Sequence, residues 1–526
     1  MTAEYKDPYD KFQYPNYCYP QTHPDRIGTL ATLLGMNPAP VQKCRVLELA
    51  CGDGANILPM AFELTDSEFL GIDRATQPVA RGMEMIEELG LKNIKLKVAD
   101  ILELPPKFGE FDYILAHGLY SWVPADVREK ILGLCRSCLS PQGVAYISYN
   151  VYPGCHLRAI VRGMMLYHTR DMSDPGERVA QGRQLLRWVA EAQSATNGYT
   201  LCLREFNEAL SKRDGAVLFH DDMAEVNSPF YFHQFVTDAA RHGLKFLSEA
   251  EYFNTHENSF PAEVAAQLKA MEETDLLGKE QYLDFLEGRS FRQTLLCHHE
   301  VELDRGVRPE MIERFYIRAE TSSVSTDPDL ASNEIESFNG PKESRIATSF
   351  PLAKAAMMYL GRIFPHYASF RDLVVNARQL LGAEDREPGD TLSEDEQTLG
   401  EVIIRAYGAG VTQLSQHQPE FALVPGDQPM VSPIARLQSQ HGPIVTSLLY
   451  NSVKFEDLLS RQLFLLLDGT RDRQMLLDEF GSLLDKAIES SALPRDPAER
   501  KRLINELSEQ LDEKLNDLGR LGFLIK

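Results

Sequence analysis

The stretch from Arg45 to Asn56 constrains the fold more than any other part of the chain. It begins with an apolar run that carries one acid, Glu48, near its end, and it continues through Gly52 and Gly54 into a helical pattern. This order predicts a buried strand that turns tightly into a helix. The glycines let the backbone pass close beneath a bound nucleoside, and Glu48 can accept a hydrogen bond from a ligand ammonium or hydroxyl group.

Three more strands are predicted over 68–73, 94–100 and 111–117, and the first two end in Asp73 and Asp100. The carboxyl ends of parallel strands meet at one edge of a sheet, where such folds bind ligands. We expect Asp73 to accept hydrogen bonds from both ribose hydroxyls. Asp100 and the apolar residue behind it suit an adenine ring.

The number and spacing of the glycines indicate which class of cofactor this edge of the sheet binds. A dinucleotide fingerprint needs a third glycine at position 57, where the chain has Ile57, so a flavin or nicotinamide is not expected. The pattern resembles motif I of class I S-adenosylmethionine (AdoMet) methyltransferases, except that Ala50 replaces the usual first glycine, which affects the strength of binding more than binding itself. The resemblance implies S-adenosyl-L-methionine as cofactor, bound by Glu48, Ala50, Gly52, Asp53, Gly54, Asn56, Asp73, Arg74, Asp100, Ile101 and His117.

The rest of the sheet is predicted from a helix over 126–139, a turn over 140–143, a fifth strand over 144–150 and a closing hairpin with strands at 244–247 and 291–296. The fold class is therefore α/β, a seven-stranded Rossmann-like class I methyltransferase sheet. A helical insertion over 156–211 is expected to dimerise or to cover the site. The tyrosine- and proline-rich first 25 residues fit a lid across the ligand and fit plain packing on the domain equally well.

Later segments predict further domains. The words His220-Asp221-Asp222-Met223 and Gln281 to Cys297 resemble the methyltransferase regulatory domain. Beyond it, a hairpin turning at Asn339-Gly340 and several short helices predict two small α+β, winged-helix-like domains on either side of a proline-rich linker. The predicted division is a methyltransferase core with an N-terminal lid (1–155), a helical insertion (156–215), a regulatory-type block (216–304), a middle domain (305–417) and a C-terminal domain (427–526).

The composition of the chain limits which partners and which cellular location we expect. The 77 acidic and 54 basic residues give a net charge of −23, which disfavours nucleic acid as a partner, including at the C-terminal domain. The chain shows neither a signal peptide nor an apolar run of about 18 residues, so a cytoplasmic protein without stable membrane association is expected. The eight cysteines suit reduced thiols, and neither Cys135-Arg136-Ser137-Cys138 nor His298-His299 has the partners of a metal site, so no metal is predicted.

Over its whole length the chain resembles the rickettsial-type lysine methyltransferases of outer-membrane proteins. The matching words lie at 117–124, 149–154 and 465–473. The resemblance implies methyl transfer to lysine side chains of a protein. Aromatic rings stabilise cationic groups, and His117 could take a proton. The candidate acceptor-site residues, all following the fourth and fifth strands, are His117, Tyr120, Trp122, Tyr149, Asn150 and Tyr152.

Two other functions fit the same pattern. A small-molecule N- or O-methyltransferase, for example one acting on a natural product, would use the extra domains for assembly or for closing the pocket. A binder without catalytic activity would keep only the fold, although the acids Glu48, Asp73 and Asp100 argue against it.

Overall fold

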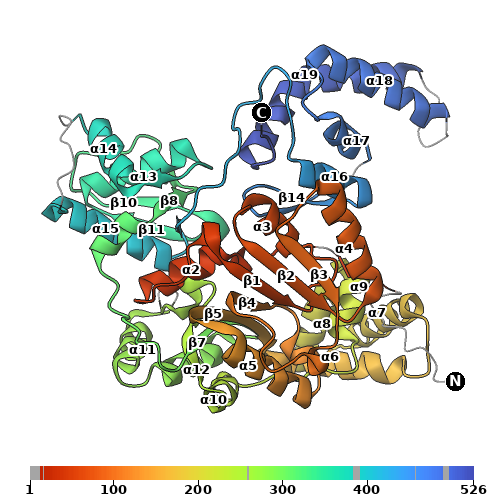
Figure 1. Ribbon diagram of the computed structural model, residues 1–526, viewed down its shortest axis with the longest axis vertical. Helices are drawn as coiled ribbons and strands as arrows, with labels where there is room; N and C mark the ends of the chain where they lie inside the picture. The colour runs from red at the N-terminus through yellow and green to blue at the C-terminus, as the bar shows by residue number, and fades with distance from the viewer. Residues whose placement is uncertain are drawn as a thin grey trace.

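A seven-stranded sheet forms the centre of the protein (Figure 1). The computed structural model describes residues 12, 14–15, 17–257, 260–382, 391–455, 458–489 and 497–525. The strand order is β3-β2-β1-β4-β5-β7-β6, in which β1 to β5 run parallel and β7 is antiparallel to both neighbours. The predicted class I methyltransferase sheet is confirmed, and its strands are β1 (Arg45–Leu49), β2 (Glu68–Asp73), β3 (Ile94–Val98), β4 (Phe111–Ala116), β5 (Leu139–Asn150), β6 (Leu244–Glu249) and β7 (Phe291–His298).

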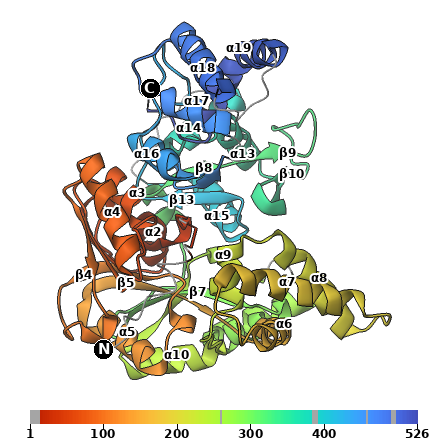
Figure 2. The ribbon, with the colours of Figure 1, turned by 90° about the vertical axis from the view of Figure 1, so that its right-hand side faces the viewer.

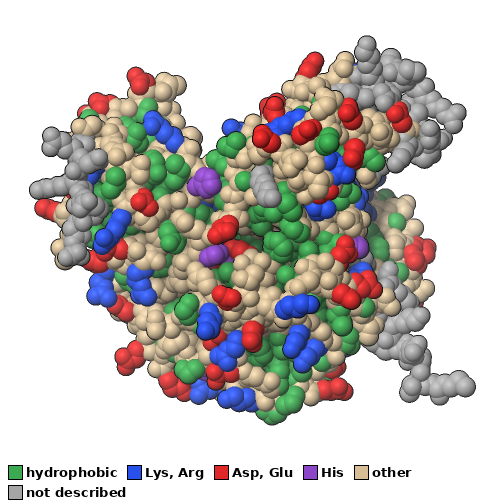
Figure 3. Space-filling view, turned by 45° about the horizontal axis from the view of Figure 1, so that its top comes forward, with side chains coloured by type: hydrophobic (Ala, Val, Ile, Leu, Met, Phe, Trp, Pro, Cys, Tyr) green, Lys and Arg blue, Asp and Glu red, His purple; other side chains and the backbone are tan. Residues whose placement is uncertain are grey.

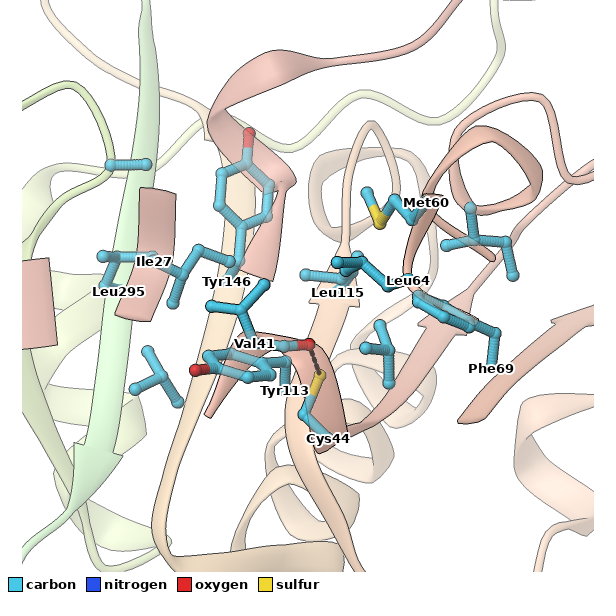
Figure 4. Packing of buried hydrophobic residues seen from close by; sticks show 14 of the residues in the cluster. Ile27, Val41, Cys44, Met60, Leu64, Phe69, Tyr113, Leu115, Tyr146 and Leu295 are labelled. Carbon is cyan, nitrogen blue, oxygen red and sulfur yellow. Dashed lines mark hydrogen bonds between the residues drawn. The ribbon is translucent and has the colours of Figure 1, made fainter. Parts of the chain in front are cut away.

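Both faces of the sheet are covered by helices, because its central strands are apolar on both sides. On β4, Tyr113 and Leu115 face one hydrophobic cluster, and Ile114 and Ala116 face another. Figure 4 shows part of the first cluster, where Ile27 from one helix lies beside Leu295 and Met60 from another lies near Leu64 and Leu115. The first face is covered by α2 (Pro24–Leu33), α3 (Ile57–Glu63) and α4 (Thr76–Leu89), and the second by α5 (Ala125–Cys138) and α10 (Phe232–Arg241).

The start of β5 differs from the prediction. The residues over 140–143, predicted as a turn, lie within the strand. Phe111 of β4 pairs with Leu139, but Tyr113 already pairs with Val144, so the strand carries an irregularity that takes up the extra residues. The proline and glycine there signal this bulge and not the end of the strand.

A buried ionic cluster fixes the last two strands. The Arg292 guanidinium on β7 is fully buried and donates to Glu249 of β6 at 2.7 Å. It also donates to Glu280 and Asp284 at 3.0 Å, both on α12 (Leu276–Glu287). The cluster therefore joins β6, β7 and α12 within the predicted regulatory-type block, to which α11 (Ala262–Thr274) also belongs.

The predicted helical insertion consists of α6 (Gly154–His168), α7 (Pro175–Glu191) and α8 (Gly198–Lys212). These helices have a hydrophobic core of their own, which includes Val161, Leu186 and Leu203. They project from one end of the sheet (Figure 2). The short helix α9 (Gly215–Val217) and the π-helical turn η5 (Leu218–Asp222) lead the chain back toward the sheet.

The segment after β7 forms an α+β unit around its own core. The hairpin predicted there is present, but its turn is longer than Asn339-Gly340: Gly340 has an extended backbone, and Lys342 and Glu343 take the positive φ angles. The elements are β8 (Tyr316–Ala319), β9 (Ser322–Ser323), β10 (Glu336–Asn339), β11 (Arg345–Thr348), α13 (Pro351–Ile363), β12 (Ala368–Ser369), α14 (Phe370–Leu380), α15 (Glu394–Gly408) and β13 (Thr412–Ser415).

The last unit also has a separate core, and the sequence had not indicated its first elements, α16 and the β14–β15 hairpin. Its elements are α16 (Pro433–His441), β14 (Ile444–Thr446), β15 (Ser452–Lys454), α17 (Leu458–Leu466), α18 (Arg473–Glu489) and α19 (Pro497–Arg520). Leu507, Leu511 and Leu515 form the buried stripe of α19. The five-part division of the chain stays a prediction.

The two C-terminal units form separate lobes with a hollow between them (Figure 3). Acidic side chains are spread over the lobe that contains α17 to α19. In the part of α19 whose side chains the structure describes, the exposed acids are Glu506, Glu509, Asp512, Glu513 and Asp517. Such a surface repels a phosphate backbone. Within the described ranges, no helix has both the length and the apolar character needed to cross a membrane.

Candidate functional site

The loop between β1 and α3 has the backbone that the glycine pattern predicted. Gly52 and Gly54 have φ angles of 57° and 78°, in the left-handed region. A Cβ atom at Gly52 would meet nothing within 4 Å, so this side of the loop is open. Ala50 has a φ of 61°, a conformation that costs an alanine about 1 kcal/mol or more. This explains why a glycine is usual at that position of motif I.

Glu48 provides a test of whether the loop suits AdoMet. Its Oε1 accepts a hydrogen bond from Asn56 Nδ2 at 2.7 Å. Its Oε2 is buried and has no hydrogen-bond partner among the residues that the structure describes. Burial raises the pKa of Glu48 to about 8, against the Asn56 hydrogen bond, and the negative charges of Asp73 and Asp53 raise it further. A buried carboxylate oxygen without a partner suits a cationic ligand group such as the ammonium of AdoMet.

Asp73 stands where β2 meets the same loop. Its carboxylate accepts hydrogen bonds from Gly52 N at 2.8 Å and from Ala75 N at 2.7 Å. These bonds fix its orientation, and each carboxylate oxygen can accept more than one bond. The arrangement fits a ribose whose hydroxyls donate to Asp73. Arg74, the next residue, is exposed.

The end of β3 adjoins Asp73, as the parallel sheet requires. Ala99 N donates to Asp73 O at 2.9 Å. Asp100 follows and accepts a hydrogen bond from Leu102 N at 2.9 Å, which caps the short turn that begins at Ile101. The three predicted acids therefore lie at one edge of the sheet, and they are not scattered.

Two segments distant in sequence complete the surroundings of Asn56. Tyr19 N donates to Asn56 Oδ1 at 2.9 Å, and Asn56 Nδ2 donates to Thr22 Oγ1 at 3.0 Å. Tyr450, from the hairpin of the C-terminal unit, donates its hydroxyl to Asn56 O and, at 3.1 Å, to Asn56 Oδ1. Its φ of 59° is rare for a residue with a side chain. Sequence reasoning missed Tyr450, because nothing local signals a contact across 394 residues.

A second residue that sequence reasoning missed is Gly82 on α4. A Cβ there would lie 2.2 Å from Asp53 O and 2.4 Å from a methyl group of Leu96. The helix therefore packs directly against the backbone of the loop. A glycine within an otherwise helical pattern is the only local signal for such a close approach.

His117 lies directly beyond the end of β4. Its Nδ1 is 2.8 Å from the Tyr146 hydroxyl, and its ring centroid is 3.7 Å from that of Tyr19. Burial lowers the pKa of His117 to about 3. At neutral pH the imidazole is uncharged and a poor proton acceptor. Its stacking against Tyr19 therefore suits a wall of the site better than a general base.

The other predicted acceptor residues divide into two groups. Tyr120 and Tyr149 are 2% and 1% exposed and pack against Phe235 of α10, in the core on the second face of the sheet. The structure therefore does not bring them to the edge where His117 lies. Asn150 is also buried and donates to Asn227 Oδ1 at 3.0 Å.

Trp122 and Tyr152 are only partly buried. The guanidinium carbon of Arg158 lies 5.9 Å from the centroid of the Trp122 ring. Tyr152 stacks on His156 with ring centroids 4.0 Å apart, and Tyr231 lies next to it at 5.3 Å. Both therefore remain available to a substrate.

Three family models match the chain. They are a methyltransferase domain at residues 46–143, a predicted methyltransferase regulatory domain at 214–298 and the PKMT C-terminal winged helix domain at 427–523. The uncharacterized protein RP789 of Rickettsia prowazekii is 31% identical over 90% of this chain and 85% of its own length. The uncharacterized protein RP028 of the same organism is 34% identical over 45% of this chain and 96% of its own.

Solved structures of PKMT2 from Rickettsia typhi match nearly the whole chain. PKMT2 from Rickettsia typhi in complex with AdoHcy has a TM-score of 0.83 and 26% sequence identity, covering 98% of this chain and 100% of that one. The similarity extends over the regulatory and C-terminal units as well as the sheet. Since PKMT2 binds AdoHcy, the demethylated product of AdoMet, the cofactor expected at Glu48 and Asp73 is AdoMet.

Proposed function

This chain belongs to the family of AdoMet-dependent methyltransferases with a regulatory domain and a PKMT-type winged helix, and on that basis we propose that it methylates lysine side chains of a protein. The observation that carries the proposal is the match to PKMT2 over 98% of the chain. The match includes the two C-terminal units, which offer surface for a large substrate. A cytoplasmic location and a dimer formed through the helical insertion stay predictions.

The residues at the edge of the sheet have distinct tasks in this proposal. Bound AdoMet supplies a methyl group on a sulfonium, which an amine attacks in line. Glu48 holds the ammonium of the cofactor, and Asp73, fixed by Gly52 N and Ala75 N, holds the ribose. Tyr19 and His117 form an aromatic wall that excludes water and stabilises cationic charge. Positioning, and not proton transfer by His117, is the main contribution of the protein.

The proposal is tested with AdoMet labelled on its methyl group. The protein is incubated with fractions of bacterial cell protein, and the modified residues are located by mass spectrometry. The proposal predicts label on lysine side-chain nitrogens, and none with an Asp73→Asn variant. Label confined to lipids or small metabolites would refute it and support the small-molecule alternative.

A further inference from the structure

The π-helical turn η5 carries two consecutive acids, Asp221 and Asp222, that the cofactor site does not use. The turn is closed by Met223 N donating to Leu218 O at 3.2 Å, a bond between residues five apart. Such turns are rare and are often found at functional sites. The turn packs against α7 of the helical insertion and directly follows α9.

Asp222 is neutralised within the protein. Its side chain is 1% exposed and accepts from Arg158 Nε at 2.7 Å and from Arg213 Nη1 at 2.8 Å. Arg162 donates to its backbone carbonyl at 3.0 Å. Three arginines therefore hold the turn in place, and Asp222 has a structural role.

Asp221 points instead to the N-terminal segment. Both of its carboxylate oxygens lie 3.5 Å from the hydroxyl of Tyr14, at the limit of a hydrogen bond. Burial raises the pKa of Tyr19, and the charges of Asp221 and then Glu48 raise it further. Tyr19 therefore lies within the electrostatic influence of both acids, while its ring lies against His117. The neighbouring Asp222 pairs with Arg158, whose guanidinium carbon lies 5.9 Å from the centroid of the Trp122 ring, so the turn lies close to the segment that follows His117.

We propose that Asp221 binds the ammonium group of the substrate lysine, an inference that rests on the proposed function. A carboxylate beside aromatic rings is the combination that recognises an alkylammonium ion. The Tyr14 hydroxyl contacts Asp221, the Tyr19 ring on the same segment lies against His117, and Trp122 lies under Arg158, which pairs with Asp222 of the same turn. The neighbouring charges of Arg158 and Arg213 are already paired with Asp222.

The charge state of Asp221 agrees with binding and not with proton removal. Burial raises its pKa to about 6, Arg158 and Arg213 lower it, Asp222 raises it, and the Tyr14 hydroxyl lowers it. At neutral pH Asp221 is mostly ionised. A lysine ammonium has a pKa of about 10.4, far above that of Asp221, so the Asp221 carboxylate does not take its proton. The proton passes to solvent. Asp221 holds the side chain in place for that loss.

The test measures binding separately from catalysis. The probe is n-butylammonium, which has the charge and length of a lysine side chain, with 1-butanol as its neutral counterpart. Saturation-transfer NMR gives their dissociation constants for the AdoHcy-loaded full chain. The variants are Asp221→Asn, Asp221→Glu and Tyr14→Phe, and the control is Asp171→Asn, whose side chain is 85% exposed. Calorimetry checks that every variant still binds AdoHcy.

The proposal predicts that Asp221→Asn weakens the binding of n-butylammonium at least tenfold and leaves the affinity for AdoHcy unchanged. Three variants should bind n-butylammonium within about threefold of the wild-type affinity: Asp221→Glu, Tyr14→Phe and Asp171→Asn. The affinity for 1-butanol should be the same in all variants. Equal binding by Asp221→Asn, no binding by the wild type, or an equal loss in Tyr14→Phe would each overturn it. Lysine methylation that survives in Asp221→Asn refutes only this inference. Asp221-dependent probe binding without methylation of any protein refutes only the proposed function.

Discussion

One glycine substitution tests how closely α4 supports the cofactor loop. Gly82→Ala places a methyl group 2.2 Å from Asp53 O, whereas ordinary contacts begin at 3.4 Å. The helix or the loop must therefore move by about 1.2 Å, the difference between the two distances. Gly133→Ala on α5 is the matched control, because a Cβ there meets nothing within 4 Å.

The two variants share the same gain in helix propensity, about 1 kcal/mol, so the difference between them isolates the clash. Overpacking of this kind costs about 1–3 kcal/mol. Gly82→Ala is therefore neutral to destabilising by about 2 kcal/mol, and Gly133→Ala is stabilising by about 1 kcal/mol. The displaced loop lies between Gly52 and Gly54, so the clash also weakens cofactor binding. A loss of about 1.4 kcal/mol of binding free energy corresponds to about tenfold in affinity.

Calorimetric titration with AdoHcy and thermal unfolding measure both effects. We expect Gly82→Ala to bind AdoHcy about tenfold more weakly and to melt below Gly133→Ala, which should bind as the wild type does. If Gly82→Ala binds AdoHcy with unchanged affinity, the loop is not supported by α4 in the way described.

Three other predictions concern the same loop. Tyr450→Phe removes the hydroxyl that donates to Asn56, so AdoHcy affinity should fall about five- to tenfold in calorimetry, while Tyr359→Phe on α13 leaves it unchanged; equal affinities would show that the C-terminal unit does not support the site. Glu48 has a pKa of about 8 in the folded protein, against an ordinary value of 4.5, so between these pH values the folded protein binds more protons than the unfolded chain. The ligand-free protein should therefore lose stability as pH rises from about 5 to 8, by up to about 1.4 kcal/mol per pH unit, and thermal scans of Glu48→Gln should lack this part of the slope. Ala50→Gly relieves a positive φ of 61°, so its melting temperature and AdoHcy affinity should be no lower than those of the wild type, and a clear loss of either would contradict the strain.

The cofactor edge could be predicted from the sequence because its signals are local. Each strand ends in an acid or a glycine turn within a few residues, and parallel strands bring these ends together. Glu48, Gly52, Gly54 and Asp73 were predicted in this way. The sheet itself followed from the same run of alternating strands and helices.

The acceptor side could not be predicted as well, for two physical reasons. A central strand with two apolar faces does not reveal which side chains face which layer. On β5, Tyr146 reaches His117, while Tyr149, three residues later, lies in the opposite core. Contacts between distant segments leave no local signal either, and Tyr450 and Asp221 are of that kind.

The central claim is that the carboxyl edge of the sheet binds AdoMet through Glu48 and Asp73. Calorimetric titration of the full chain with AdoMet, repeated with Asp73→Asn, tests it most directly. We predict one site in the wild type and a loss of affinity of at least tenfold in the variant, whose fold is checked by its unfolding transition. A folded Asp73→Asn protein that binds AdoMet as tightly as the wild type, or a wild type that does not bind it, would contradict the claim.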